Sequence, residues 1–323
     1  MRRSGVWLST AALCLWGSLA HAETWDMPTA YPASNYHTEN AVQFAKDVAD
    51  RTGGELEITV HPGGSLFKGD EIKRAVQTGQ VQIGERLISA LANENPLFGI
   101  DALPFLATSF DEAQKLYEAS RPALEKVLDE QGMKLLYAVP WPPQGLYTQK
   151  PIEKASDMQG VKFRAYNAAT ARVAELMGAV PTQIEEAELS QAFATGVAES
   201  MISSGSTGYD RKLWEHTSYW YDAQAWLPKN MVFVNLEAFD ALPADQQQAL
   251  LDAAKDAETR GWKKAQELAD WYKEQLAEHG MKVQPPGDQL EADFEKIGEQ
   301  MTEEWLATAG DDGKQVIEKY RSM

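Results

Sequence analysis

The side chain best suited to chemistry in this sequence is an arginine at the end of an expected strand. Val161 and Phe163 would point to one face of this strand, which leaves Arg164 on the opposite face. A helix is expected to begin directly afterwards, so the guanidinium would stand beside unpaired backbone N–H groups. A planar cation at such a position suits a carboxylate, and an ordinary salt bridge is the alternative.

Motifs for catalysis, nucleotide binding or metal binding are missing from the sequence. It contains no G-x-x-x-x-G-K-[ST], G-x-G-x-x-G, H-E-x-x-H or G-x-S-x-G pattern. The histidines beyond residue 22 are not paired at metal-ligand spacing; they are His37, His61, His216 and His279. The pair Glu185-Glu186 lies beside an expected helix start, where carboxylates cap free N–H groups. We therefore expect no enzymatic activity, no cofactor and no metal.

The N-terminus has the order of a secretory signal peptide. Met1-Arg2-Arg3 is basic, residues 6–19 are apolar, and the small-residue triplet Ala20-His21-Ala22 follows. This pattern predicts cleavage after Ala22 and export to the periplasm. The only cysteine, Cys14, lies within the signal, so neither disulfides nor thiol chemistry is expected in the mature chain.

The composition is strongly acidic. The full chain carries 30 Lys+Arg against 48 Asp+Glu, a formal charge of −18, and loss of the two signal-peptide arginines would leave 28 against 48, or −20. A field of this sign repels nucleic acid, so no nucleic-acid partner is expected. A site for an anion would have to be built locally from a few placed donors.

Helices alternate with short strands along most of the chain. Apolar residues recur at helical spacing over residues 36–52, where Gly53-Gly54 ends the pattern, and alternation predicts a strand over 56–60. A helix over 70–78 followed by a strand over 81–83 repeats this order. Further strands are expected over 134–139, 145–149, 161–165, 199–203 and 231–235. This order predicts an α/β fold, and roughly 300 residues suit two lobes, each a sheet flanked by helices.

A short internal similarity bears on how the two lobes are related. Residues 71–79 and 188–196 share the pattern E-[IL]-x-x-A-φ-x-T-G, where φ is apolar, and each precedes an expected strand. The pattern indicates either a duplicated unit or a helix that simply ends in a glycine cap. In the first case the two strands would face each other. Because open α/β sheets bind ligands at the carboxyl ends of strands, this nominates Glu85, Arg86, Ser203 and Ser204.

The last third of the chain is expected to be largely helical. Residues 243–280 are helix-forming throughout except at Gly261, so one long helix could brace both lobes, or it could break at that glycine. Two more helices are expected over 289–307 and 312–321. We predict a first lobe of residues 23–147 with about 230–260, and a second of 148–229 with about 261–323. The ligand cleft would lie between them.

Three motifs resemble the receptor family of tripartite ATP-independent periplasmic (TRAP) transporters, the DctP family. They are D-M-Q-G-V-K-F-R at 157–164, M-G-A-V-P at 177–181 and E-L-S-Q-A-F-A-T-G-V at 188–197. The resemblance implies a two-lobed, type II-like periplasmic binding protein with a long helix spanning the lobes. It implies capture of a small organic acid, and delivery to a TRAP permease of small and large membrane subunits that an ion gradient drives. We expect the receptor to be a monomer.

The resemblance also implies site residues. In the family, the arginine of D-x-x-G-x-K-x-R clamps the solute carboxylate, and this position is Arg164. Where members commonly carry an asparagine after the T-G-V strand, Ser203 stands here, and Gln144 is nearest to a second arginine. These neutral residues favour an acid with one clamped carboxylate and an aromatic, hydroxylated or sugar-like remainder. The predicted site comprises Arg164, Gln144, Tyr166, Asn167, Ser203, Arg86, Glu85, Trp141, Tyr31 and Tyr209, with Arg86 either a second cation for the ligand or a partner of Glu85.

Two other classes of function remain open at this point. The same fold could serve a sensory ligand receptor that docks to a signalling kinase. Acidic residues could also serve a periplasmic enzyme that acts on carboxylates, although no motif indicates one.

Overall fold

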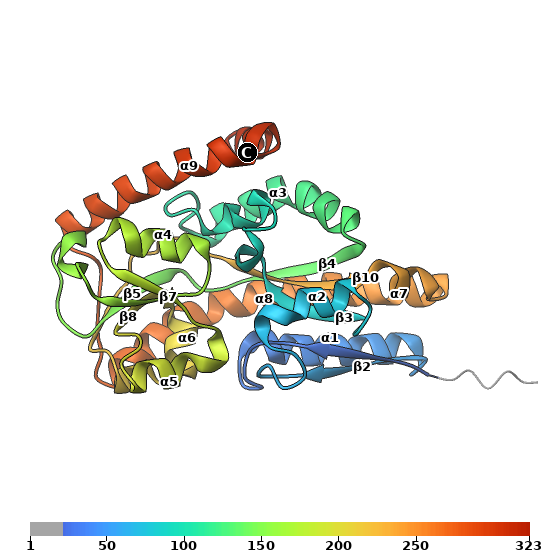
Figure 1. The fold of residues 1–323 in the computed structure, drawn as a ribbon. Helices are drawn as coiled ribbons and strands as arrows, with labels where there is room; N and C mark the ends of the chain where they lie inside the picture. The colour runs from blue at the N-terminus through green and yellow to red at the C-terminus, as the bar shows by residue number, and fades with distance from the viewer. Residues whose placement is uncertain (1–21) are drawn as a thin grey trace, which may run out of the picture.

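A computed structural model describes residues 22–323, arranged as two α/β lobes joined by long helices (Figure 1). The predicted signal peptide lies outside the described residues apart from Ala22. The first lobe holds a parallel pair of strands and a three-stranded sheet ordered β3-β10-β4, in which β10 is antiparallel to both neighbours. The second lobe holds one mixed sheet ordered β11-β9-β5-β8-β6-β7. Both expectations, an α/β class and two lobes, are confirmed.

The strands of the first lobe are β1 (Glu23–Pro28), β2 (Leu56–His61), β3 (Ile83–Leu87), β4 (Met133–Pro140) and β10 (Lys229–Asn235). Its helices are α1 (Tyr36–Thr52), η1 (Gly69–Glu71), α2 (Ile72–Gln77), η2 (Ile88–Leu91), η3 (Pro96–Ala102), α3 (Phe110–Glu130) and α7 (Leu236–Ala241). The predicted helix over 36–52 has the same bounds in the structure, because Gly53 adopts a left-handed conformation that ends it.

The strands of the second lobe are β5 (Gln144–Thr148), β6 (Lys162–Ala165), β7 (Val180–Gln183), β8 (Ser200–Ser204), β9 (Tyr219–Tyr221) and β11 (Lys282–Gln284). Its helices are η4 (Ala155–Met158), α4 (Ala168–Leu176), η5 (Glu186–Glu188), α5 (Leu189–Ala194), α6 (Gly205–Asp210) and η6 (Leu213–Glu215). Because β5 begins at residue 144 and pairs with β8 and β9, the predicted lobe boundary after residue 147 would cut a strand. We propose that the chain first crosses between the lobes just before Gln144.

One predicted strand is displaced. The strand expected over 81–83 lies instead at β3, which begins at Ile83. The preceding residues complete the end of α2, since the N–H groups of Gln80 and Val81 both bond to the carbonyl of Ala75, at 2.8 and 3.3 Å. Residues that close a helix this way are not free to join a sheet.

The same local unit occurs twice, 117 positions apart. Residues 69–87 and 186–204 each form a short 3₁₀ turn, a six-residue helix, a glycine turn and a five-residue strand. Gly79 and Gly196 both have φ of 69°, where a residue with a Cβ is strained. The similarity over 71–79 and 188–196 therefore corresponds to a repeated structure.

Two long helices cross from one lobe to the other (Figure 1). α8 (Ala244–Glu278) is continuous through Gly261, so the alternative of a break there is wrong; it packs on α1 and β4 in the first lobe and on α6 and β11 in the second. A Cβ at Gly261 would clash with Val139, so the glycine permits this close packing. α9 (Asp288–Arg321) lies over α3 and α4 and changes direction at Gly310, as the two predicted helices require.

Candidate functional site

A small pocket lies where residues of both lobes meet. Its volume is about 40 Å³, several times the roughly 10–15 Å³ that one ordered water needs, so it can hold a small molecule. Eight of its lining residues are predicted from the sequence: Tyr31, Arg86, Trp141, Gln144, Arg164, Tyr166, Ser203 and Ser204. The others are Ala30, Leu87, Glu185, Glu186, Thr207 and Pro228. The strands that follow Gly79 and Gly196 both reach this pocket.

Arg164 lies on β6, between β7 and β8, and is 3 % exposed. Its Nε donates to the carbonyl of Ile184 at 3.0 Å, and its guanidinium carbon lies 5.1 Å from the ring centroid of Tyr166. The nearest carboxylate is that of Glu186, at 3.5 Å from Nη2. Burial lowers the pKa of Arg164 because the charged form is desolvated, while the Glu186 charge opposes this shift. Within residues 22–323 its terminal nitrogens make no hydrogen bond, so they are open to a ligand.

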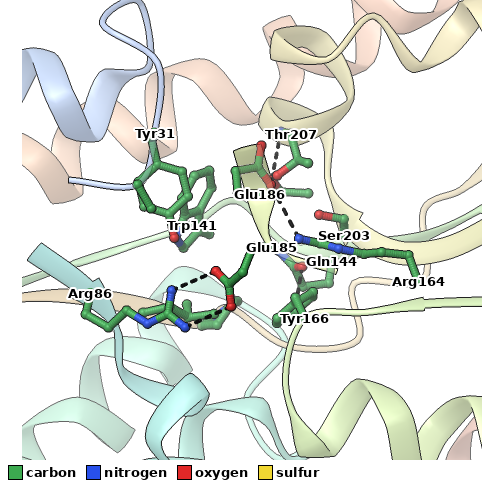
Figure 2. Close-up of a pocket in the computed structure, with 14 residues that line it drawn as sticks. Tyr31, Arg86, Trp141, Gln144, Arg164, Tyr166, Glu185, Glu186, Ser203 and Thr207 are labelled. Carbon is green, nitrogen blue, oxygen red and sulfur yellow. Dashed lines mark hydrogen bonds and ion pairs between the residues drawn. The ribbon is translucent and has the colours of Figure 1, made fainter. Parts of the chain in front are cut away.

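Arg86, on β3, is paired across the cleft and not with Glu85. Its two terminal nitrogens donate to the two carboxylate oxygens of Glu185 at 3.1 and 3.2 Å. Figure 2 shows Glu185 reaching toward Arg86, while Arg164 approaches from the opposite side. The prediction that Glu185 and Glu186 only cap a helix is corrected: Glu185 precedes η5, but its side chain makes no capping hydrogen bond there.

Glu186 is held from outside the pocket. Arg211 donates from Nε to Oε1 of Glu186 at 2.9 Å, while Arg164 lies near the other oxygen. The charged residues that line the pocket, Arg86, Arg164, Glu185 and Glu186, sum to zero. Because Arg211 takes one oxygen of Glu186 from outside the pocket, the guanidinium of Arg164 is left without a full carboxylate partner. An incompletely paired cation suits a single anionic group, in a protein whose overall charge is strongly negative.

The amide of Gln144 is fixed by hydrogen bonds on both sides. Its Nε2 donates to the carbonyl of Pro142 at 3.0 Å, and its Oε1 accepts from the hydroxyl of Tyr166 at 3.2 Å. That hydroxyl accepts in turn from Nε1 of Trp226 at 3.1 Å. Ser203 makes no side-chain hydrogen bond to the described residues, so its hydroxyl is available to a ligand.

Two aromatic side chains form an apolar wall. The rings of Tyr31 and Trp141 have centroids 4.8 Å apart, and both side chains donate to Oδ1 of Asn230, at 3.3 and 2.9 Å. Burial and these shared hydrogen bonds fix the wall before any ligand arrives. Such a wall suits the flat or apolar part of a small molecule.

Three residues predicted at the site do not line the pocket, because other contacts hold them. Glu85 points away and accepts a hydrogen bond from Thr29 at 2.5 Å, and burial raises its pKa to about 7. Asn167 caps α4 and donates to Ser89 of the first lobe at 2.9 Å. Tyr209 packs against Trp271, with ring centroids 4.9 Å apart. Glu85 and Asn167 therefore act behind the pocket, and Tyr209 belongs to a separate aromatic cluster.

The described residues contain no group of three or more His, Cys, Asp or Glu side chains that could hold a metal ion. Among the helices of residues 22–323, none is long and apolar enough to cross a membrane.

Two α/β lobes around a small cleft lined by a buried arginine are the architecture of a protein that encloses a small acidic solute. The chain belongs to the bacterial extracellular solute-binding proteins, family 7 (DctP), which it matches over residues 28–308. The predicted family is thereby confirmed.

Solved structures and a further relative agree with this assignment. DctP6 of Bordetella pertussis, an extracytoplasmic solute receptor binding pyroglutamic acid, is 53% identical with a TM-score of 0.92, covering 93% of this chain and 100% of that one. A marine metagenome TRAP solute-binding protein, solved with co-purified pyroglutamate, is 51% identical with a TM-score of 0.93, covering 94% and 99%. The ectoine/5-hydroxyectoine-binding protein UehA of Ruegeria pomeroyi is 23% identical over 317 residues, covering 95% and 92%.

The chain is a TRAP-type receptor that binds a small organic acid for transport. Its family is extracytoplasmic and works with membrane components of the transporter. Its members and structural neighbours are receptors and not enzymes.

Proposed function

We propose that this receptor captures pyroglutamate in the periplasm and delivers it to a TRAP permease of small and large membrane subunits. The receptor acts as a monomer, after cleavage of a signal peptide behind Ala22, and leaves its solute chemically unchanged. Three solved relatives at 53%, 51% and 48% identity bind pyroglutamate, which makes this acid the first candidate.

The incompletely paired guanidinium of Arg164 is the observation that carries the proposal. Pyroglutamate has one carboxylate and a neutral five-membered lactam ring, so it is a monoanion. The open guanidinium of Arg164 would take the carboxylate, and the wall of Tyr31 and Trp141 would cover the ring. The lactam N–H and C=O need one acceptor and one donor, and the hydroxyl of Ser203 can act as either.

Calorimetry and thermal unfolding with a small set of acids test this proposal. We expect L-pyroglutamate to bind and to raise the unfolding temperature, because a ligand that binds only the folded state stabilises it. Proline, which has the same ring size but a charged amine in place of the lactam N–H, is expected to bind weakly. Succinate is the dicarboxylate control. The proposal fails if pyroglutamate gives no heat and no stabilisation, or if succinate binds more tightly.

Chromatography of the ligand after prolonged incubation separates a receptor from an enzyme. A receptor returns all of the pyroglutamate intact, whereas any conversion in step with protein concentration would contradict the transport assignment.

A further inference from the structure

The guanidinium groups of the two arginines at the pocket differ in how completely they are paired with carboxylates of the protein. Arg86 is held by both oxygens of Glu185, whereas the only charged partner of Arg164 in the described chain is Glu186 at 3.5 Å. The side chain of Arg86 is 8 % exposed and that of Glu185 is 23 % exposed. A bidentate, largely buried pair of this kind is strong and directional.

The Arg86–Glu185 pair is enclosed by its surroundings. A Cβ placed on Gly69 would lie 2.5 Å from Nη1 of Arg86 and 2.6 Å from Oε2 of Glu185, so the missing side chain leaves room for the pair. Glu186 is pinned by Arg211, which limits how far the adjacent Glu185 can withdraw. The pair is therefore a built part of the pocket wall.

We propose that Glu185 is a specificity residue, which makes the receptor accept acids with one carboxylate and reject acids with two. This inference rests on the proposed function, since it takes the solute to be a small carboxylic acid held by Arg164. Glu185 acts by occupying Arg86, the cation that would otherwise receive a second carboxylate.

The physical reason is the cost of a second negative charge. A dicarboxylate with one end on Arg164 would bring its other end to a wall where Arg86 is already neutralised. It would then meet the carboxylate of Glu185 in a poorly solvated cleft, or have to break the ion pair. A neutral lactam or amide end meets no such repulsion. The discrimination thus comes from a repulsive element as much as from an attractive one.

Glutarate and its monoamide, glutaramate, form a matched pair of probes, because they have the same length and differ by one charge. By calorimetry, wild-type protein should bind glutaramate at least about tenfold more tightly than glutarate. In Glu185→Gln, which frees Arg86, the ratio should shift toward glutarate by about tenfold or more. Glu188→Gln, the same change at an exposed residue of η5, should leave the ratio as in wild type.

Two further variants test the mechanism. They also keep the inference testable if Glu185→Gln does not fold. Arg86→Gln should shift the ratio further toward glutaramate, because Glu185 then stands unneutralised. The double variant Arg86→Gln with Glu185→Gln keeps the net charge but removes both the cation and the repelling carboxylate, so its ratio should lie between those of the two single variants.

Equal binding of the two probes by wild-type protein would overturn the inference, as would an unchanged ratio in Glu185→Gln. A shift toward glutarate in the double variant as large as that in Glu185→Gln would also contradict it, since Arg86 would not be the receiving cation. Failure of pyroglutamate to bind wild-type protein would refute the proposed solute alone, because the ratio for the matched probes does not depend on that ligand.

Discussion

The two repeated units, residues 69–87 and 186–204, have the same backbone and different chemical contents. Where the first places Glu85 and Arg86 on its strand, the second places Ile202 and Ser203 at the corresponding positions. The helix, its glycine end and the strand direction follow from a local pattern that both units share. The charge presented at the pocket is independent of that pattern, so one scaffold supplies a cation on one side and a hydroxyl on the other.

The largest expected difference is in ligand affinity, between substitution of Arg164 on one side of the cleft and of Arg86 on the other. Arg164→Ala should weaken binding of pyroglutamate by about 4 kcal/mol, close to a thousandfold in Kd, because a buried carboxylate loses its only open cation. The double Arg86→Gln, Glu185→Gln variant should keep Kd within about threefold, since it removes a pair that is already neutral. Calorimetry measures both.

Arg74→Ala is the matched control, because Arg74 is exposed on α2 of the first unit. If Arg164→Ala binds pyroglutamate as tightly as wild type does, Arg164 is not the carboxylate clamp. The two arginines on opposite sides of the cleft would then not differ in their contribution to ligand affinity.

The next expected difference is in the pH dependence of stability. It arises from Glu85, whose counterpart in the second unit is the apolar Ile202. Burial raises the pKa of Glu85 to about 7, so between its ordinary value and pH 7 the folded protein binds a proton that the unfolded chain has released. The stabilisation is fully present below about pH 4.5 and is lost as pH rises through 7, up to about 3 kcal/mol.

Urea unfolding at pH 5 and pH 8 measures this effect. Glu85→Gln should remove that part of the pH dependence, whereas Glu57→Gln, at an exposed position of β2, should keep it. Burial also raises the pKa values of Asp101 and Asp210 to about 6 and lowers the pKa of His37, which lies 3.6 Å from Glu85, so these groups contribute opposing slopes to the stability in both variants. An identical pH dependence in wild type and Glu85→Gln would contradict the assignment.

The smallest expected effect is a loss of stability that should be the same in the two repeated units. Gly79→Ala and Gly196→Ala should each lower the free energy of unfolding by about 1–2 kcal/mol, because both have φ of 69° and a Cβ there meets no atom within 4 Å. The penalties should be alike and nearly additive in the double variant. Gly287→Ala, at negative φ and equally open, should cost little. Unequal penalties at Gly79 and Gly196 would show that the units are not equivalent.

Features that depend on neighbours in the chain could be predicted from the sequence. The helix of residues 36–52, the repeated glycine ends and the position of Arg164 at a strand end all follow from local spacing, and all are found in the structure. The displaced strand at β3 marks a limit of the same reasoning, because periodicity does not show where the turn after Gly79 stops and the sheet begins.

Features that depend on distant partners could not be predicted. Arg86 and Glu185 are 99 positions apart, and nothing in either local segment indicates that they pair. The local pattern around Glu185-Glu186 indicates helix caps, but cations from two strands and from the turn after α6 take these carboxylates instead. The abundance of aromatic residues near the expected cleft predicts Tyr209 at the site, yet its ring packs against Trp271.

The length of α8 has a mechanical consequence. Its 35 residues make a rod of about 52 Å at about 1.5 Å per residue, with one part seated on each lobe. Because the same continuous helix packs on both lobes, a change in the angle between the lobes requires α8 to bend or to shift against one of them.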